Sequence, residues 1–195
     1  MRRLYVLFFV SGFPALLYQV VWQRALFAIY GINVESVTVV VSAFMLGLGI
    51  GSLLGGWLST RPGLRRLLVF GVIEVGIGVF GLVSLAAFAW VGDATAGSGT
   101  WATGAWTFLL VLVPTTLMGA TLPLLTAHLV DRSGNVGASV GALYFVNTLG
   151  SAVACFAAAL FLLGWLGQAG TVQLAAALNI ALGVGVLAIV RGERR

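Results

Sequence analysis

Charged residues are scarce in this sequence, and lysine is missing altogether. Only 8% of the 195 residues are charged, whereas a soluble domain usually carries about a quarter. In contrast, 61% of the residues are hydrophobic and the mean hydropathy is +1.11. A soluble domain needs a polar surface around its core, and so few charged residues cannot supply one. The composition therefore excludes a soluble globular protein and predicts a membrane protein.

Residue types that commonly bind metals or carry out catalysis are also few. The chain has one cysteine, Cys155, which cannot form an internal disulfide, and one histidine, His128, whose nearest acidic residue in the sequence is Asp131. We therefore expect no metal site and no cofactor. An enzyme acting on a lipid would need a cluster of acid, base or metal-binding groups, and none is visible. The chain is expected to be non-catalytic on its own.

Long apolar segments make up most of the sequence. A helix needs roughly 20 residues to cross a hydrocarbon core of about 30 Å, and this chain has several runs of that length. They lie at 4–28, 37–58, 67–91, 105–130, 138–163 and 171–190. Membrane strands would instead alternate apolar and polar residues, and no such alternation is visible. The sequence predicts an all-α membrane protein, with a single domain over residues 1–195 that forms a six-transmembrane-helix bundle.

The arginines indicate the orientation, because cytoplasmic loops next to membrane helices are rich in basic residues. All except Arg24 would lie on one side of a six-helix arrangement: Arg2, Arg3, Arg61, Arg65, Arg66, Arg132, Arg191, Arg194 and Arg195. The loops on the other side contain Glu35 and Asp93. We expect a multi-pass protein of the cell membrane with both termini in the cytoplasm. The net charge of +5 then describes a membrane face in contact with the lipid bilayer, and no nucleic-acid partner is needed to explain it.

The first apolar run also has an alternative interpretation as a secretory signal peptide, because Arg2 and Arg3 precede it. Cleavage would leave five helices with the same loop orientation. A cleavage site normally has small residues, whereas Tyr18, Gln19 and Trp22 stand where such a site would be expected. We therefore expect an uncleaved first helix.

Glu74 is the strongest candidate for a functional residue, because a carboxyl group within a membrane helix is costly and usually faces the interior of the bundle or a cavity. It could be a binding site for a cation or proton, or it could hold helices together through hydrogen bonds. Asn147 is most simply explained by such interhelical hydrogen bonding, and Asn179 likewise.

The first helix carries a second polar group, near its outer end. Gln19 and Gln23 share one face at a spacing of four residues, and Tyr18 and Trp22 share another. Together with Arg24 they could line a binding site. The favoured interpretation is an aromatic and basic anchor at the outer surface of the membrane.

Glycine spacing predicts where helices pack closely. Gly47, Gly51 and Gly55 follow one another at intervals of four residues, so they form a stripe on one face of the second helix. Small residues in such a stripe let a neighbouring helix approach closely in the membrane. A phosphate-binding loop is not expected, because no strand precedes these glycines.

Pro114 and Pro123 both fall within the fourth run. A proline within a helix removes a backbone hydrogen bond and bends the helix, and the freed carbonyl group needs another donor. The hydroxyl groups of Thr115, Thr116 and Thr121 are expected to help. The result could be a simple kink or a hinge that moves during transport.

Four segments together resemble the transmembrane region of membrane-bound spermidine synthase-like proteins, in which a major-facilitator-like membrane part is fused to a synthase domain. They are SGFPALLYQVVWQR (11–24), AFMLGLGIGS (43–52), PTTLMGATLP (114–123) and LYFVNTLG (143–150). That family usually has glutamate at the position of Gln19. The soluble aminopropyltransferase domain has no counterpart in this sequence.

The resemblance implies a membrane module that anchors a synthase or moves a polyamine. A separate spermidine synthase-like chain would then be a partner. The segment 56–66 is similar to the loop between helices two and three of major-facilitator transporters, which implies half of such a transporter and pairing with a second copy. For transport we expect Glu74, Tyr18, Gln19, Trp22, Arg24 and Asn147 to contribute to binding. The competing interpretation is a purely structural or interaction protein.

Overall fold

The computed structural model describes residues 2–31 and 33–192 of the chain. The regular structure in these residues is entirely helical. The elements are α1 (Arg2–Tyr30), α2 (Asn33–Ser59), α3 (Arg66–Ala94), α4 (Thr100–Ser133), α5 (Val136–Ala157), a π-helical turn η1 (Ala158–Leu162) and α6 (Leu163–Gly192).

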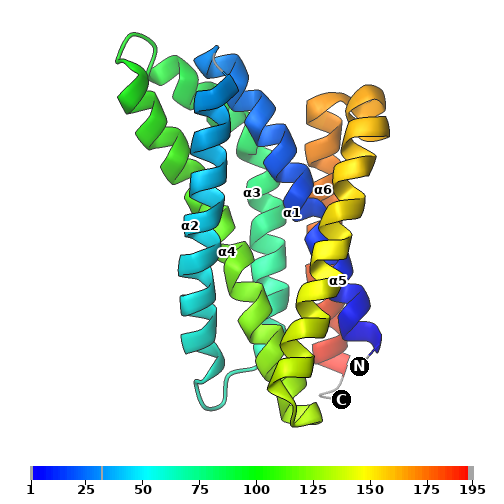
Figure 1. The fold of residues 1–195 in the computed structure, drawn as a ribbon. Coiled ribbons are helices and arrows are strands. Elements are labelled where there is room, and N and C mark those ends of the chain that lie inside the picture. Colours follow the sequence, from blue (N-terminus) through cyan, green and yellow to red (C-terminus); the bar gives the residue numbers. More distant parts are fainter. Residues whose placement is uncertain (1, 32, 193–195) are drawn as a thin grey trace.

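Within the described residues, five helical stretches are long and apolar enough to cross a membrane. The last of these extends from Val136 to Gly192, a length of 57 residues. It contains Gly167, whose backbone angles of φ 65° and ψ −172° are not helical and are accessible essentially only to glycine. The chain turns back at this point, so that α6 runs in the opposite direction to α5 (Figure 1).

Both ends of the described chain lie at the same end of the bundle (Figure 1). The α2–α3 and α4–α5 connections lie there too, and with them most of the arginines. Arg66 on α3 forms a salt bridge with Asp131 on α4, and Arg65 donates a hydrogen bond of 3.2 Å to the carbonyl oxygen of Val190 on α6. These contacts join three helices at this end. Arg194 and Arg195 lie outside the described residues.

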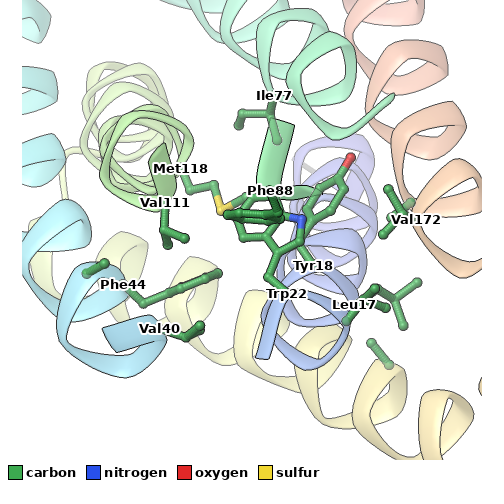
Figure 2. Packing of buried hydrophobic residues seen from close by; sticks show 14 of the residues in the cluster. Leu17, Tyr18, Trp22, Val40, Phe44, Ile77, Phe88, Val111, Met118 and Val172 are labelled. Carbon is green, nitrogen blue, oxygen red and sulfur yellow. The ribbon is translucent and has the colours of Figure 1, made fainter. Parts of the chain in front are cut away.

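Helix α1 lies at the centre of the arrangement and contacts all the other α-helices. On α1, Tyr18 and Trp22 are stacked with ring centroids 5.0 Å apart, and both side chains are completely buried. The Trp22 ring also packs against Phe44 of α2 and against Phe80 and Phe88 of α3 (Figure 2). An anchor at the membrane surface would be exposed to lipid, so that interpretation is wrong for Tyr18 and Trp22.

Helices α2 and α4 pack closely along the glycine stripe of α2. A Cβ atom added at Gly47, Gly51 or Gly55 would come within 3.0 Å of atoms of α4. Gly119 of α4 lies equally close to the backbone of Leu48. Because backbone atoms are involved on both sides, the two helices could not keep this distance with larger residues.

Pro114 and Pro123 leave α4 as one continuous helix. Pro123 removes the hydrogen bond that the carbonyl of Gly119 would otherwise accept. Ser52 of α2 donates to that carbonyl at a distance of 3.4 Å. The nearby threonines donate elsewhere. Thr116 donates to Leu112 and Thr121 to Met118 within α4, and Thr115 is within hydrogen-bonding distance of Val111 in α4 and of Ala43 in α2. The freed carbonyl of Gly119 is therefore satisfied by α2, and the expectation that these threonines would serve it is wrong.

Candidate functional site

The carboxyl group of Glu74 lies in the interior of the bundle and is completely buried. Its position on α3 is fixed by two hydrogen bonds of 2.5 Å. Ser11 of α1 donates through its hydroxyl group to one carboxylate oxygen, and Asn179 of α6 donates through its amide nitrogen to the other. Glu74 therefore connects three helices. Among the described residues no salt bridge compensates its charge, since the one that is present joins Arg66 and Asp131.

A cavity of about 130 Å³ lies next to this network, and each helix from α1 to α6 contributes to its wall. Its polar lining consists of hydroxyl and amide groups, on Ser11, Gln19, Thr121, Asn147, Ser151 and Asn179. Its apolar lining includes Phe44, Ile77 and Met118. Ser11 and Asn179 thus face both the cavity and Glu74, so the carboxylate lies directly behind the cavity wall.

Asn179 has one hydrogen-bonding atom without a partner among the described residues. Its side chain is 2% exposed, and its amide nitrogen is used by Glu74, but its Oδ1 atom has no hydrogen-bond partner among the described residues. A buried polar atom normally has a partner in the protein, in water or in a ligand. The Asn179 oxygen is therefore an unused hydrogen-bond acceptor on a residue of the cavity wall.

Two of the other residues expected at a binding site lie at the cavity. Gln19 of α1 lines it and is partly buried. Asn147 of α5 lines it too, and its amide nitrogen donates a hydrogen bond of 3.2 Å to the carbonyl oxygen of Phe8 on α1. This bond leaves the Asn147 side-chain oxygen able to accept one.

The remaining three residues of that group do not line the cavity. Trp22 is packed in the aromatic core and donates a hydrogen bond of 3.0 Å from its ring nitrogen to Ser84. Tyr18 lies against Gly81 of α3. Arg24 is exposed on the outside of α1. Tyr18 and Trp22 therefore support the site from behind, while Arg24 is separate from it.

Ser11 and Ser151 contribute to the site and were not singled out from the sequence. Ser151 of α5 donates to the carbonyl oxygen of Gly12 on α1 at 3.0 Å, beside the cavity. Serine is common in membrane helices, where it often bonds to the backbone of its own helix. Ser11 and Ser151 differ from other serines because they contact helices that are distant in the sequence, and the sequence does not show such contacts.

The chemistry of this site suits a cation that can donate hydrogen bonds. Neutral amide and hydroxyl oxygens line the cavity, and the carboxyl group of Glu74 lies one residue behind them. The described residues include no group of three or more His, Cys, Asp or Glu side chains that could hold a metal ion. An ammonium group needs only oxygen acceptors and a compensating charge, so it matches the site better than a metal ion does.

Comparison with known proteins gives no independent assignment. No protein-family model matches the chain, and neither a curated protein nor a solved structure matches it. The geometry of the site is therefore the basis on which a function can be assigned.

Proposed function

We propose that this chain is a six-crossing protein of the cell membrane that binds an amine cation in its central cavity and moves it across the membrane. In this proposal α5 and α6 are two separate crossings, joined at Gly167, and both termini lie in the cytoplasm. The arginines at the end of the bundle that holds both termini support this orientation.

One observation carries the proposal: the buried network of Glu74, Asn179 and Ser11 on the wall of a polar cavity. An intramembrane carboxyl group is costly unless it is paired or used. Here the free oxygen of Asn179 can accept a hydrogen bond from an ammonium group. Glu74 would then supply the opposite charge at short range through Asn179.

The size of the cavity limits how the cation is bound. A volume of about 130 Å³ accommodates a group of roughly the size of benzene. One ammonium group with a few methylene groups fits this space, whereas a whole polyamine does not. A long amine would therefore be bound by one end at a time.

The resemblance of four segments to spermidine synthase-like membrane regions makes a polyamine the first substrate to test. It also makes a separate synthase chain a candidate partner. This non-catalytic module would deliver a polyamine to that chain or remove one from it. A second copy of the chain would complete a transporter if six helices form only one half of it.

The experiment is uptake of labelled spermidine into proteoliposomes. We expect flux with the wild-type chain and no flux with Glu74→Gln, which keeps the size of the side chain but removes the charge. Asp93→Asn is the matched control, because Asp93 is also an acid on α3 but is exposed at its end. Circular dichroism and gel filtration would confirm that all three proteins are folded.

Absence of spermidine flux in the folded wild-type protein would sink polyamine transport by this chain alone and leave anchoring of a partner as the better account. Flux that survives Glu74→Gln would show that the carboxylate is not needed, and the assignment of the site would be wrong.

A further inference from the structure

A second cavity lies at the end of the bundle opposite the two termini. It is a groove of about 680 Å³ lined by the last residue of α1 and by the first turns of α2 and α4. Tyr30 comes from α1, Glu35 from α2, and Trp101 and Phe108 from α4. These four residues define the far-end groove. None of them belongs to the central cavity.

Aromatic rings form the walls of the far-end groove. The hydroxyl group of Tyr30 is 2.6 Å from the hydroxyl group of Thr107 on α4, which fixes the ring in place. Trp101 is 94% exposed, so one face of its indole ring is accessible to a ligand. The face of an aromatic ring attracts cations, and tryptophan does so most strongly.

Glu35 gives the groove a negative charge. It lies in the first turn of α2, is partly buried, and forms no salt bridge within the described part of the chain. Glu35 and Tyr30 both line the groove. The charge and the ring therefore belong to the same small region of the groove.

We propose that the far-end groove binds an organic ammonium ion from the surrounding water. One carboxylate among aromatic rings provides too few ligands for a metal ion, but it provides a charge and π faces for an ammonium group with an apolar body. The volume of the groove is large enough for a whole small amine. This site is separate from the amine site proposed for the central cavity, and its occupation does not require transport.

The test uses choline as the probe and 3,3-dimethylbutan-1-ol as its uncharged counterpart of the same shape. The protein is labelled with 5-fluorotryptophan in nanodiscs of phosphatidylglycerol, and the fluorine resonance of Trp101 is identified by its loss in Trp101→Phe. We expect choline to shift this resonance in a saturable way and the alcohol to leave it unchanged. Glu35→Gln should weaken choline binding by about tenfold.

Two variants, Asp93→Asn and Trp101→Phe, show whether choline binds in the far-end groove or elsewhere on the protein. Asp93→Asn removes the other acid at this end of the bundle and should leave the choline affinity unchanged. The Trp101 resonance reports on the far-end groove and not on the central cavity, so that failure of the central site and failure of this one can be told apart. Trp101→Phe should weaken choline binding measured by isothermal titration calorimetry, which keeps the test decisive if Glu35→Gln does not fold.

Equal shifts with choline and the alcohol would overturn the proposal, because the groove would then recognise shape without charge. Unchanged affinity in Glu35→Gln would overturn it as well. If nanodiscs containing phosphatidylethanolamine shift the Trp101 resonance without choline and block its binding, the ammonium group belongs to a lipid headgroup, and the proposed source in water is wrong.

Discussion

Asn179 on α6 donates a hydrogen bond of 2.5 Å to Glu74 on α3, although 105 positions separate the two residues in the sequence. Both side chains are buried, and among the described residues Glu74 forms no salt bridge. This pair thus joins the third and last helices in the interior of the bundle. The free energy of interaction between the two side chains is best measured by replacing one residue and then both.

Asn179→Val should destabilise the protein by about 3 kcal/mol, because one oxygen of a buried carboxylate loses its donor. The double variant Glu74→Leu with Asn179→Val removes both polar groups and should recover most of that loss. Unfolding free energies in mixed micelles would be compared for the wild type, both single variants and the double variant. A double variant that costs the sum of the single ones would contradict the pairing.

Gly51→Ala should destabilise the protein by about 1–3 kcal/mol, because its Cβ atom would collide with the backbone of α4 near Thr116 and Gly119. Gly49→Ala is the matched control, since nothing lies within 4 Å of a Cβ atom at that position. There the better helix propensity of alanine should stabilise the helix by up to about 1 kcal/mol. Thermal unfolding in detergent would show the opposite signs. Equal effects of the two substitutions would contradict the close α2–α4 contact.

Gly167→Ala should cost about 1–3 kcal/mol, because the backbone angles at this turn are strained for any residue with a side chain. Gly164→Ala lies three residues earlier in the same helix, where an added Cβ atom meets nothing within 4 Å. It should be neutral or slightly stabilising. Chemical denaturation of both variants would test this, and a tolerated Gly167→Ala would argue against a reversal of the chain at this residue.

The orientation and the number of crossings can be tested by labelling single cysteines in whole cells. Cys155→Ser provides a background without cysteine. We expect Ser98→Cys and Gln168→Cys to react with an impermeant maleimide from outside, and Pro62→Cys to react only after the membrane is permeabilised. All three positions are exposed in the structure. A Gln168→Cys variant that is protected outside and labelled inside would exclude two separate crossings by α5 and α6.

The sequence predicts the helical class and the approximate extent of the helices, because apolar runs are easy to recognise. It predicts connections less well. Residues 92–104 contain many glycines and polar residues and were expected to form a loop, but α3 extends to Ala94 and α4 begins at Thr100. Residues 164–170 were expected to separate two helices, but in this segment non-helical backbone angles occur at Gly167 alone. Helices in lipid gain little from ending early, since every residue outside a helix leaves backbone groups without partners.

The glycine stripe predicts the packed face of α2, but for most of the other helices the inward face could not be predicted, since membrane helices are apolar on both the buried and the lipid-facing sides. Tyr18 and Trp22 show this, because the same residue types occur at membrane surfaces and in cores. The importance of Glu74 could be predicted from its charge alone. Its donors could not, because Ser11 and Asn179 approach it only when α1, α3 and α6 come together.

The central position of α1 has a consequence for biogenesis. Helix α1 leaves the ribosome first among the described helices, yet it packs against α5 and α6, which leave last. Until α6 is inserted, the Glu74 carboxyl group has Ser11 as a donor and lacks Asn179. The Glu74 carboxyl group is therefore incompletely paired in the nascent protein, and the arrival of α6 completes its hydrogen bonds.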